Sequence, residues 1–186
     1  MTNHASDALV FFGATGDLAY KKIFPSLQAM VKRGHLNVPV IGVAKSGWNL
    51  KQLQARVRDS LEKHGGVDSA AFEKLISLLR YVDGDYSDNA TFQAIRSELK
   101  DSKRPAHYLA IPPLLFGTVV EQLGRLGSVE AARVIVEKPS EMTLLPHGVS
   151  TASCVEHSRN PIFFVLTIIL ASRRSTTSYF SGSLTP

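Results

Sequence analysis

The sequence predicts an α/β protein built on a doubly wound, mostly parallel sheet. Three observations lead to this prediction: short apolar runs alternate with amphipathic helical segments, glycine or proline ends most of these segments, and a turn with two glycines directly follows the first apolar run. Strands that alternate with helices are joined by right-handed crossovers. The strands are therefore parallel, and helices cover both faces of the sheet.

Length, charge and cysteine content limit the class of protein. A chain of 186 residues is long enough for one domain with a substantial core and short for two. The net charge of +5 is mild and the basic residues are scattered, so we expect no nucleic-acid partner. A single cysteine excludes an internal disulfide, and we assign no metal ligands. No signal peptide is visible and the apolar run at 162–171 is too short to cross a bilayer, so we expect a cytoplasmic protein without membrane association.

The first apolar run, 9–12, leads through Gly13 and Gly16 into a helical segment. Gly13 lets the backbone turn sharply, and Gly16 leaves room for a pyrophosphate to approach the amides at the positive end of the helix. The spacing G-x-x-G-x-x-A differs from the commoner G-x-G-x-x-G, so a plain strand–helix connection is the alternative. Asp17 is better explained as a helix N-terminal acid than as a catalyst.

The next elements follow from hydrophobic periodicity. Residues 17–33 have an apolar period near three and a half and predict an amphipathic helix, which Pro25 kinks or splits. Gly34 ends this helix, and the apolar run 38–44 predicts a second, buried strand. The segment 50–63 again has a helical period and predicts the second helix.

The second half of the sheet is predicted from the same signals. Ser87 or Asp88 caps a helix, and the pair Pro112–Pro113 stops a strand. In chain order we expect a helix at 69–79, a strand at 80–82, a helix at 88–100, a strand at 107–111, a helix at 114–126 and a strand at 133–136.

Four features fall at the carboxyl ends of predicted strands, where a doubly wound sheet binds its ligands. They are the glycine turn, Lys45, Tyr108 and Lys138. This coincidence favours a Rossmann-type dinucleotide site over a plain turn. No acid follows the second strand, and a cation in that place accommodates a 2'-phosphate, so Lys45 favours NADP over NAD.

Each of these side chains also has a simpler explanation. Lys45 and Lys138 are equally compatible with exposed cations that follow a strand. In a ligand site, Lys138 would place a point charge on a substrate phosphate or beside the coenzyme. His107 and Tyr108 point to opposite faces of their strand, and Tyr108 either stacks on a coenzyme or packs in the core.

Three motifs together resemble the glucose-6-phosphate dehydrogenase family. Phe-Gly-Ala-Thr-Gly-Asp-Leu-Ala at 12–19 resembles its coenzyme motif, and Tyr-Leu-Ala-Ile-Pro-Pro at 108–113 and Val-Ile-Val-Glu-Lys-Pro at 134–139 resemble two more. The resemblance runs from 9 to 139 and implies that 1–139 is an NADP-binding Rossmann domain. It also implies the family reaction, oxidation of glucose 6-phosphate to 6-phosphogluconolactone with NADP in the pentose phosphate pathway.

The resemblance implies a role for each matching residue. The turn and helix start would hold the pyrophosphate, Lys45 the 2'-phosphate, and Lys138 both the coenzyme and glucose 6-phosphate. Most of the family has arginine in place of Lys45, and lysine gives up a bidentate group, so we expect a weaker preference for NADP. The implied coenzyme-binding residues are Gly13, Ala14, Thr15, Gly16, Asp17, Leu18, Ala19, Tyr20, Lys45, Gly84, Asp85, Tyr108 and Lys138.

The resemblance stops after Pro139. The family continues with Phe-Gly and later carries Arg-Ile-Asp-His-Tyr-Leu-Gly-Lys, whereas 140–186 contains neither and has no lysine or aspartate. Shifted by one base, codons for 164–172 can encode that later motif. We therefore interpret 140–186 as an out-of-frame tail of disordered or irregular structure, caused by a one-base deletion beside codon 139. The family's second, α+β domain is then missing.

The missing domain determines the expected function. In the family it supplies a histidine–aspartate base, so we assign no catalytic residue to this chain and expect an inactive coenzyme-binding fragment that does not assemble into the family's homo-oligomer. One alternative is an NADP-dependent dehydrogenase domain of the glucose-fructose oxidoreductase type, which also has Glu-Lys-Pro but lacks the Gly-Asp-Leu-Ala turn. Another is a non-enzymatic NADP-binding remnant. Short-chain dehydrogenases fit less well, because no Tyr-x-x-x-Lys pair occurs.

Overall fold

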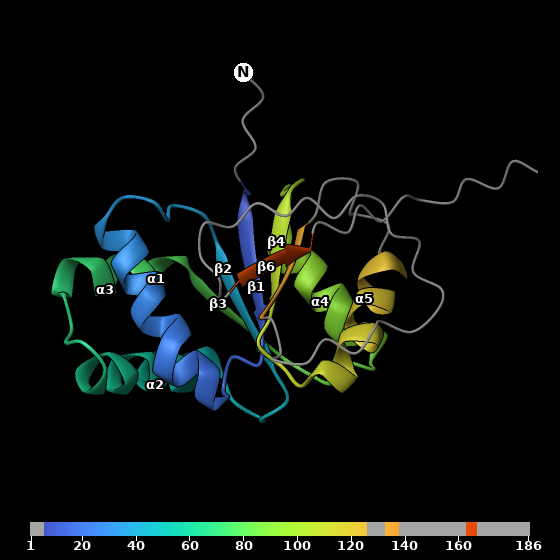
Figure 1. Cartoon of the computed structure of the whole chain (residues 1–186), viewed down its shortest axis with the longest axis horizontal. Helices are drawn as coiled ribbons and strands as arrows, with labels where there is room; N and C mark the ends of the chain where they lie inside the picture. The colour runs from blue at the N-terminus through green and yellow to red at the C-terminus, as the bar shows by residue number, and fades with distance from the viewer. Residues whose placement is uncertain (1–5, 126–132, 138–162, 167–186) are drawn as a thin grey trace, which may run out of the picture.

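A six-stranded sheet with the order β3-β2-β1-β4-β5-β6 forms the centre of the protein (Figure 1). The computed structural model describes residues 6–125, 133–137 and 163–166. Strands β1 to β5 are parallel and β6 is antiparallel to β5, which confirms the predicted, mostly parallel sheet. The strands are β1 (Ala8–Phe12), β2 (Val40–Ala44), β3 (Leu79–Asp83), β4 (Pro105–Leu109), β5 (Arg133–Glu137) and β6 (Phe163–Leu166).

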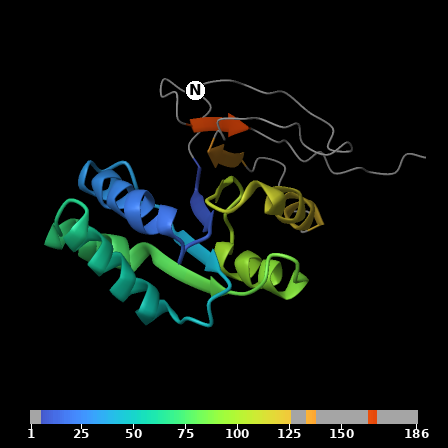
Figure 2. The ribbon, with the colours of Figure 1, turned by 60° about the horizontal axis from the view of Figure 1, so that its bottom comes forward.

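Helices cover both faces of the sheet, as a doubly wound fold requires. Figure 2 shows α1, α2 and α3 on one side and α4 and α5 on the other. Two apolar clusters result, one between each helix layer and the sheet. The helical elements are η1 (Ala19–Ile23), α1 (Phe24–Lys32), α2 (Leu50–Lys63), α3 (Ser69–Leu78), α4 (Asn89–Leu99), η2 (Pro113–Leu115) and α5 (Phe116–Arg125).

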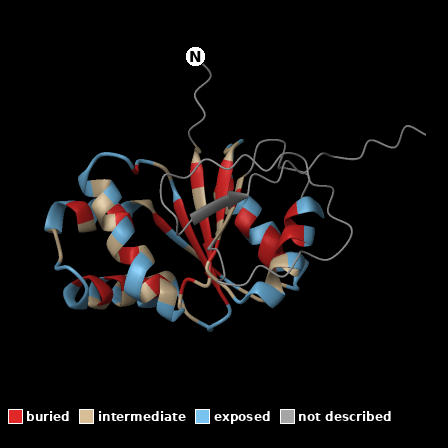
Figure 3. Ribbon diagram, in the orientation of Figure 1, coloured by how far each residue is buried: buried red, intermediate tan, exposed pale blue. Residues whose placement is uncertain are grey.

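Strands β1 and β2 are apolar throughout because both of their faces are covered. All five residues of β2 are buried, and Figure 3 shows the central strands mostly in the colour of buried residues. Neighbouring side chains of β1 pack against helices on opposite faces of the sheet. Phe11 packs edge-on against Phe24 of α1, and Phe12 stacks on Phe92 of α4. Burial of such a side chain contributes roughly 2–3 kcal/mol. The alternation therefore anchors both helix layers to one strand.

The predicted element order is confirmed, and the bounds differ at a few ends. Strand β4 begins at Pro105, earlier than expected, because the Asp7 carboxylate accepts hydrogen bonds from the amides of Lys103 and Arg104. Proline is tolerated there as the first residue of a strand. The cap of α4 is Asp88, which accepts from the amide of Ala90.

We expected disordered or irregular structure for 140–186. Strand β6 lies within this segment, so the expectation is wrong for its four residues. It pairs with β5 in antiparallel register from Val134↔Leu166 to Glu137↔Phe163. The other residues of 140–186 lie outside the described residues. The domain boundary at Pro139 therefore stays a prediction.

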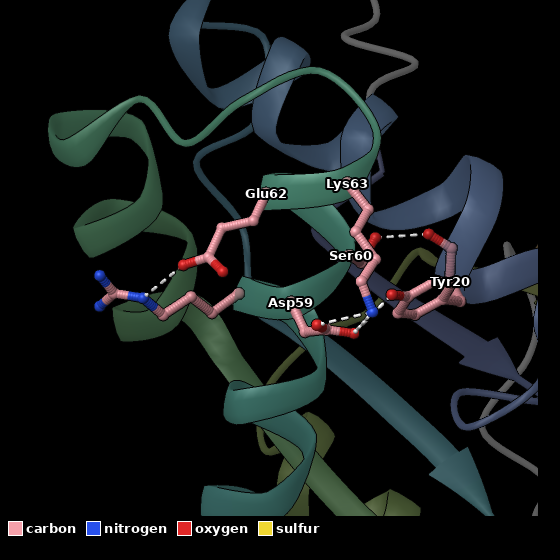
Figure 4. A network of polar contacts seen from close by, with 6 residues as sticks. Tyr20, Asp59, Ser60, Glu62 and Lys63 are labelled. Atoms are coloured by element: carbon pink, nitrogen blue, oxygen red, sulfur yellow. Dashed lines mark hydrogen bonds and ion pairs between the residues drawn. The ribbon is translucent and has the colours of Figure 1, made fainter.

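Pro25 splits the first helix, as its place in the sequence suggested. The π-helical segment η1 precedes it, and the amide of Phe24 bonds to the carbonyl of Ala19, five residues back. In that pattern the carbonyl of Tyr20 would need a donor from residue 25, and proline has none. The hydroxyl of the fully buried Ser60, on α2, donates to the Tyr20 carbonyl instead (Figure 4). Ser60 thus completes the hydrogen bonding of a helix that is remote in sequence.

Replacement of Ser60 by alanine should lower the free energy of unfolding by about 1–3 kcal/mol, because a buried carbonyl loses its donor. Urea denaturation measures this loss. In the background of Pro25→Ala, which restores an amide at position 25, the same replacement should cost less. Equal losses in the two backgrounds would contradict the explanation.

Candidate functional site

The turn after β1 is closed by hydrogen bonds to the carboxyl end of β2. The Gly13 amide donates to the Val43 carbonyl at 2.9 Å, and the Ala14 amide donates to the same oxygen at 3.1 Å. Gly13 has φ +85°, which favours glycine, and a Cβ atom there would overlap the carbonyl oxygen of Ala110 and lie 3.0 Å from its carbon. The turn therefore needs glycine at position 13 because β1, β2 and the end of β4 meet there.

The helix after this turn begins with amides that have no acceptor within the helix. Its helical conformation begins at Asp17, and the first amides of a helix have no carbonyl within it. Gly16 bonds through its amide to the carbonyl of Gly13, but in the described part of the chain the amides of Asp17, Leu18 and Ala19 have no backbone acceptor. Gly16 is exposed and has no side chain. The start of the helix, exposed at Gly16 and Asp17, is therefore positively polarised and suited to an anion.

Lys45 follows β2 directly and pairs with an acid that follows β3. Its Nζ lies 2.6 Å from Oδ2 of Asp85, and both side chains remain substantially exposed, at 71% and 41%. The ammonium donor holds the pKa of the Asp85 carboxyl well below its usual range, and Asp85 in turn raises the pKa of Lys45. Lys45, the cation predicted to bind the 2'-phosphate, is therefore already paired with the carboxylate of Asp85.

A second carboxylate shapes the loop after Lys45. Oδ1 of Asp83 accepts from the amides of Ser46 and Gly47 at 3.0 and 2.9 Å. These bonds, that from Ser46 first, lower the pKa of Asp83. The Tyr81 hydroxyl also donates to this oxygen at 2.8 Å, and burial raises the pKa of Tyr81 to about 12, so the phenol keeps its proton. Asp83 therefore fixes the conformation of the loop that begins directly after Lys45.

Tyr86 is a site residue that the sequence analysis missed. Its hydroxyl accepts from the Gly13 amide at 3.0 Å and donates to the Val43 carbonyl at 3.3 Å. Burial raises the pKa of Tyr86, so the phenol remains a donor at neutral pH. An aromatic residue in a polar loop carries no signal of this contact. Tyr86 ties the loop after β3 to the glycine turn.

Gly84 has a packing role that is visible in the structure. Its amide donates to the Ala44 carbonyl at 3.0 Å, and a Cβ atom there would overlap Oγ1 of Thr91 and lie 2.9 Å from its Cγ2. The approach of α4 to β3 therefore requires glycine. A coenzyme contact of Gly84 stays a prediction.

Tyr20 points toward α2, as Figure 4 shows. Its hydroxyl donates to Oδ2 of Asp59 at 2.5 Å, and the Arg56 guanidinium lies 4.6 Å from the centre of its ring. Ala19 is fully buried. Tyr20 and Ala19 therefore pack the helix start against its surroundings, and a coenzyme contact of either residue stays a prediction.

The remaining predicted residues belong to β4 and to the segment after β5. Tyr108 pairs in register with Phe11 and packs, partly buried, against the same apolar cluster as Phe11. His107 is buried against the other cluster, beside Phe12, so the predicted alternation of these two side chains is confirmed. Thr15 is half-buried within the turn. Lys138 lies outside the described residues.

A hollow of about 450 Å³ lies between α1, the C-terminal end of α2 and the loop 64–68. Its charged lining is internally neutralised, since Nζ of Lys32 lies 2.8 Å from Oδ2 of Asp68. None of the predicted site residues lines it. Within the described residues no three potential metal ligands gather. None of the described helices has the length and hydropathy needed to cross a membrane.

The comparisons with known proteins point to one family. A family model described as glucose-6-phosphate dehydrogenase, NAD binding domain, matches residues 10–146. Glucose-6-phosphate 1-dehydrogenase 1 of Mycobacterium tuberculosis (strain H37Rv) is 38% identical over 135 residues, which cover 73% of this chain and 29% of that protein.

Solved structures agree in fold and sequence. The crystal structure of glucose-6-phosphate 1-dehydrogenase from Mycobacterium avium is 42% identical, with a TM-score of 0.69 over 73% of this chain and 30% of the other. A structure of glucose-6-phosphate dehydrogenase in complex with its substrate glucose-6-phosphate is 28% identical, with a TM-score of 0.61 over 73% of this chain and 31% of the other. The chain thus spans less than a third of the length of these relatives. Because the family model covers most of the sequence, the chain belongs to the glucose-6-phosphate dehydrogenase family and carries its NAD-binding domain.

Proposed function

We propose that the described domain binds NADP at the carboxyl edge of β1, β2 and β3. The observation that carries the proposal is the exposed start of the helix at Gly16 and Asp17, which follows a turn that is bonded to Val43, two residues before Lys45. The amides suit the pyrophosphate and the cation suits the 2'-phosphate. Relatives of this chain are named as glucose-6-phosphate 1-dehydrogenases, a family of NADP-dependent oxidoreductases, which supports the same coenzyme.

Replacement of Gly16 by valine tests this site. Gly16 is exposed, has no positive φ, and a Cβ atom there would have one close neighbour, the Gly13 carbonyl oxygen at 3.2 Å. A shift of a few tenths of an ångström relieves this tight contact, so we expect the valine to block the amides and leave the fold intact. NADP at about 100 times its Kd should stabilise the parent chain by about 2.7 kcal/mol, measured as a rise in Tm. The valine variant should lose this rise.

The control for this variant is its free energy of unfolding without coenzyme, which should stay within about 1 kcal/mol of the parent value. A folded valine variant with an undiminished rise would place the coenzyme elsewhere. No rise in the parent chain at millimolar NADP would overturn the proposed function.

We also propose that this chain does not oxidise glucose 6-phosphate by itself. The given sequence lacks the histidine–aspartate base and the motif Arg-Ile-Asp-His-Tyr-Leu-Gly-Lys that the family resemblance implies. Reduction of NADP in the presence of glucose 6-phosphate by the purified chain would contradict this. The cytoplasmic location and the absence of the family's normal assembly stay predictions.

The proposed origin of 140–186 is a one-base deletion beside codon 139. It explains why a specific family resemblance ends at one position, although the family model extends to residue 146. The nucleotide sequence is the test. Codons for 164–172 that cannot encode Arg-Ile-Asp-His-Tyr-Leu-Gly-Lys in the shifted frame would exclude the deletion.

A further inference from the structure

The carboxylate of Asp85 is held rigidly in front of Lys45. Its Oδ1 accepts from the amide and the hydroxyl of Ser87 at 2.9 and 2.7 Å, which leaves Oδ2 directed at Nζ of Lys45. The Ser87 carbonyl in turn accepts from Nε2 of the buried Gln122, on α5, at 3.0 Å. Because these contacts fix its position, Asp85 cannot move aside without the loss of hydrogen bonds.

Asp85 also lies on the same rim as the glycine turn. The next residue, Tyr86, bonds to the Gly13 amide and to the Val43 carbonyl, two residues before Lys45. The preceding residue, Gly84, bonds to the carbonyl of Ala44, the residue before Lys45. The backbone around Asp85 is therefore attached to both parts of the proposed coenzyme site.

A carboxylate at this rim acts on the two coenzymes in opposite ways. A 2'-phosphate must compete with Asp85 for the Lys45 ammonium and also meets a like charge. A free ribose 2'-hydroxyl has a proton to donate, and acids at the adenosine end of dinucleotide sites accept it. Lys45 alone favours NADP, and its acidic partner opposes that preference.

We propose that Asp85 is the residue that sets the balance between NADP and NAD at this site. It lowers affinity for NADP by holding the Lys45 ammonium, and it supports NAD as an acceptor for the ribose hydroxyl. The inference rests on the proposed function, since it concerns selectivity at the same coenzyme site. Lys45 and Asp85 together, and not Lys45 alone, then determine which coenzyme the domain prefers.

The test is the ratio of the Kd values for NADPH and NADH, measured separately through coenzyme fluorescence with the full chain. In Asp85→Asn, NADPH should bind about tenfold more tightly, as expected for the loss of one nearby like charge, while NADH stays unchanged or weakens. In Lys45→Ala, NADPH should weaken by about tenfold and NADH should change little. The matched control is Glu62→Gln, which removes one negative charge from the exposed Arg58–Glu62 pair near the end of α2 and should leave the ratio unchanged.

The outcomes separate the inference from the proposed function. If Asp85→Asn weakens both coenzymes equally, the carboxylate only supports the loop, and the inference is wrong while the proposed function stands. An unchanged ratio in Asp85→Asn would overturn the inference in the same way. Failure of the parent chain to bind either coenzyme would overturn both. Asp85→Ser serves as a second variant, because it also removes the charge and must shift the ratio in the same direction.

Discussion

Replacement of Gly13 by alanine is expected to lower the free energy of unfolding by about 3 kcal/mol or more and to abolish coenzyme binding. The backbone there has φ +85°, which costs an alanine roughly 1–2 kcal/mol. In addition, the new Cβ atom would overlap the carbonyl oxygen of Ala110. The Ala110 oxygen is a backbone atom, so no change of side-chain rotamer relieves the overlap. The backbone of Ala110 is itself held in place, because its amide donates to the Phe12 carbonyl at 3.1 Å.

Gly34 offers the matched control for this variant. It has φ +73° at the end of α1, and a Cβ atom there would meet nothing within 4 Å. Gly34→Ala should therefore show only the backbone cost, about 1–2 kcal/mol. Urea denaturation of both variants separates the overlap from the strained φ. Equal losses would mean that the strands around Gly13 can move apart and that the turn is not fixed by β4.

Acidification from pH 6.5 to pH 4 should remove about 3 kcal/mol of stability through His107 alone. The side chain is 1% exposed, and burial lowers its pKa from 6.5 to about 4. Its Nδ1 has no hydrogen-bond partner among the described residues, and Phe12 lies beside the ring. The imidazole is therefore neutral in the folded protein at neutral pH.

The sign follows from proton binding. Between pH 6.5 and 4 the unfolded chain binds the His107 proton and the folded chain does not, so each fall in pH favours unfolding. Well above pH 6.5 both states are neutral at this residue and the contribution is constant. Carboxyls with lowered pKa, such as Asp59, Asp83 and Asp85, lose their contribution only as pH falls toward and below their ordinary value of 3.8. The window between pH 6.5 and about 4.5 therefore isolates the histidine.

The measurement is a series of urea denaturations across this pH range for the parent chain and for His107→Leu, a substitution that fills a similar volume without a titratable group. The parent should lose stability steeply between pH 6.5 and 4, and the leucine variant should be nearly flat to about pH 4.5. Parallel curves for the two proteins would show that His107 does not account for the acid sensitivity.

The fold could be predicted from sequence because the relevant information is local. The apolar run of β2, the helical period of α2 and the Pro25 break each depend on neighbouring residues, and each is found at or near its expected place. Gly13 could also be assigned, since a turn of this kind needs a residue that tolerates positive φ.

The site was predicted less completely because its contacts join residues that are distant in the chain. The pairing of Lys45 with Asp85, the bond of Tyr86 to the glycine turn and the direction of Tyr20 toward Asp59 have no signature in the sequence around each residue. All three depend on how the crossovers place the ends of the strands side by side.

The sequence by itself determined the alternation of strands and helices, the glycine turn and the family, since hydrophobic period and motif spacing are properties of the chain read in order. Only the tertiary structure decided which charges meet. From the sequence, Lys45 is predicted to bind a 2'-phosphate. In the folded protein its ammonium is already paired with Asp85. The physical reason is that electrostatic interaction depends on distance in space, and the parallel sheet brings two residues that are far apart in sequence to within 2.6 Å.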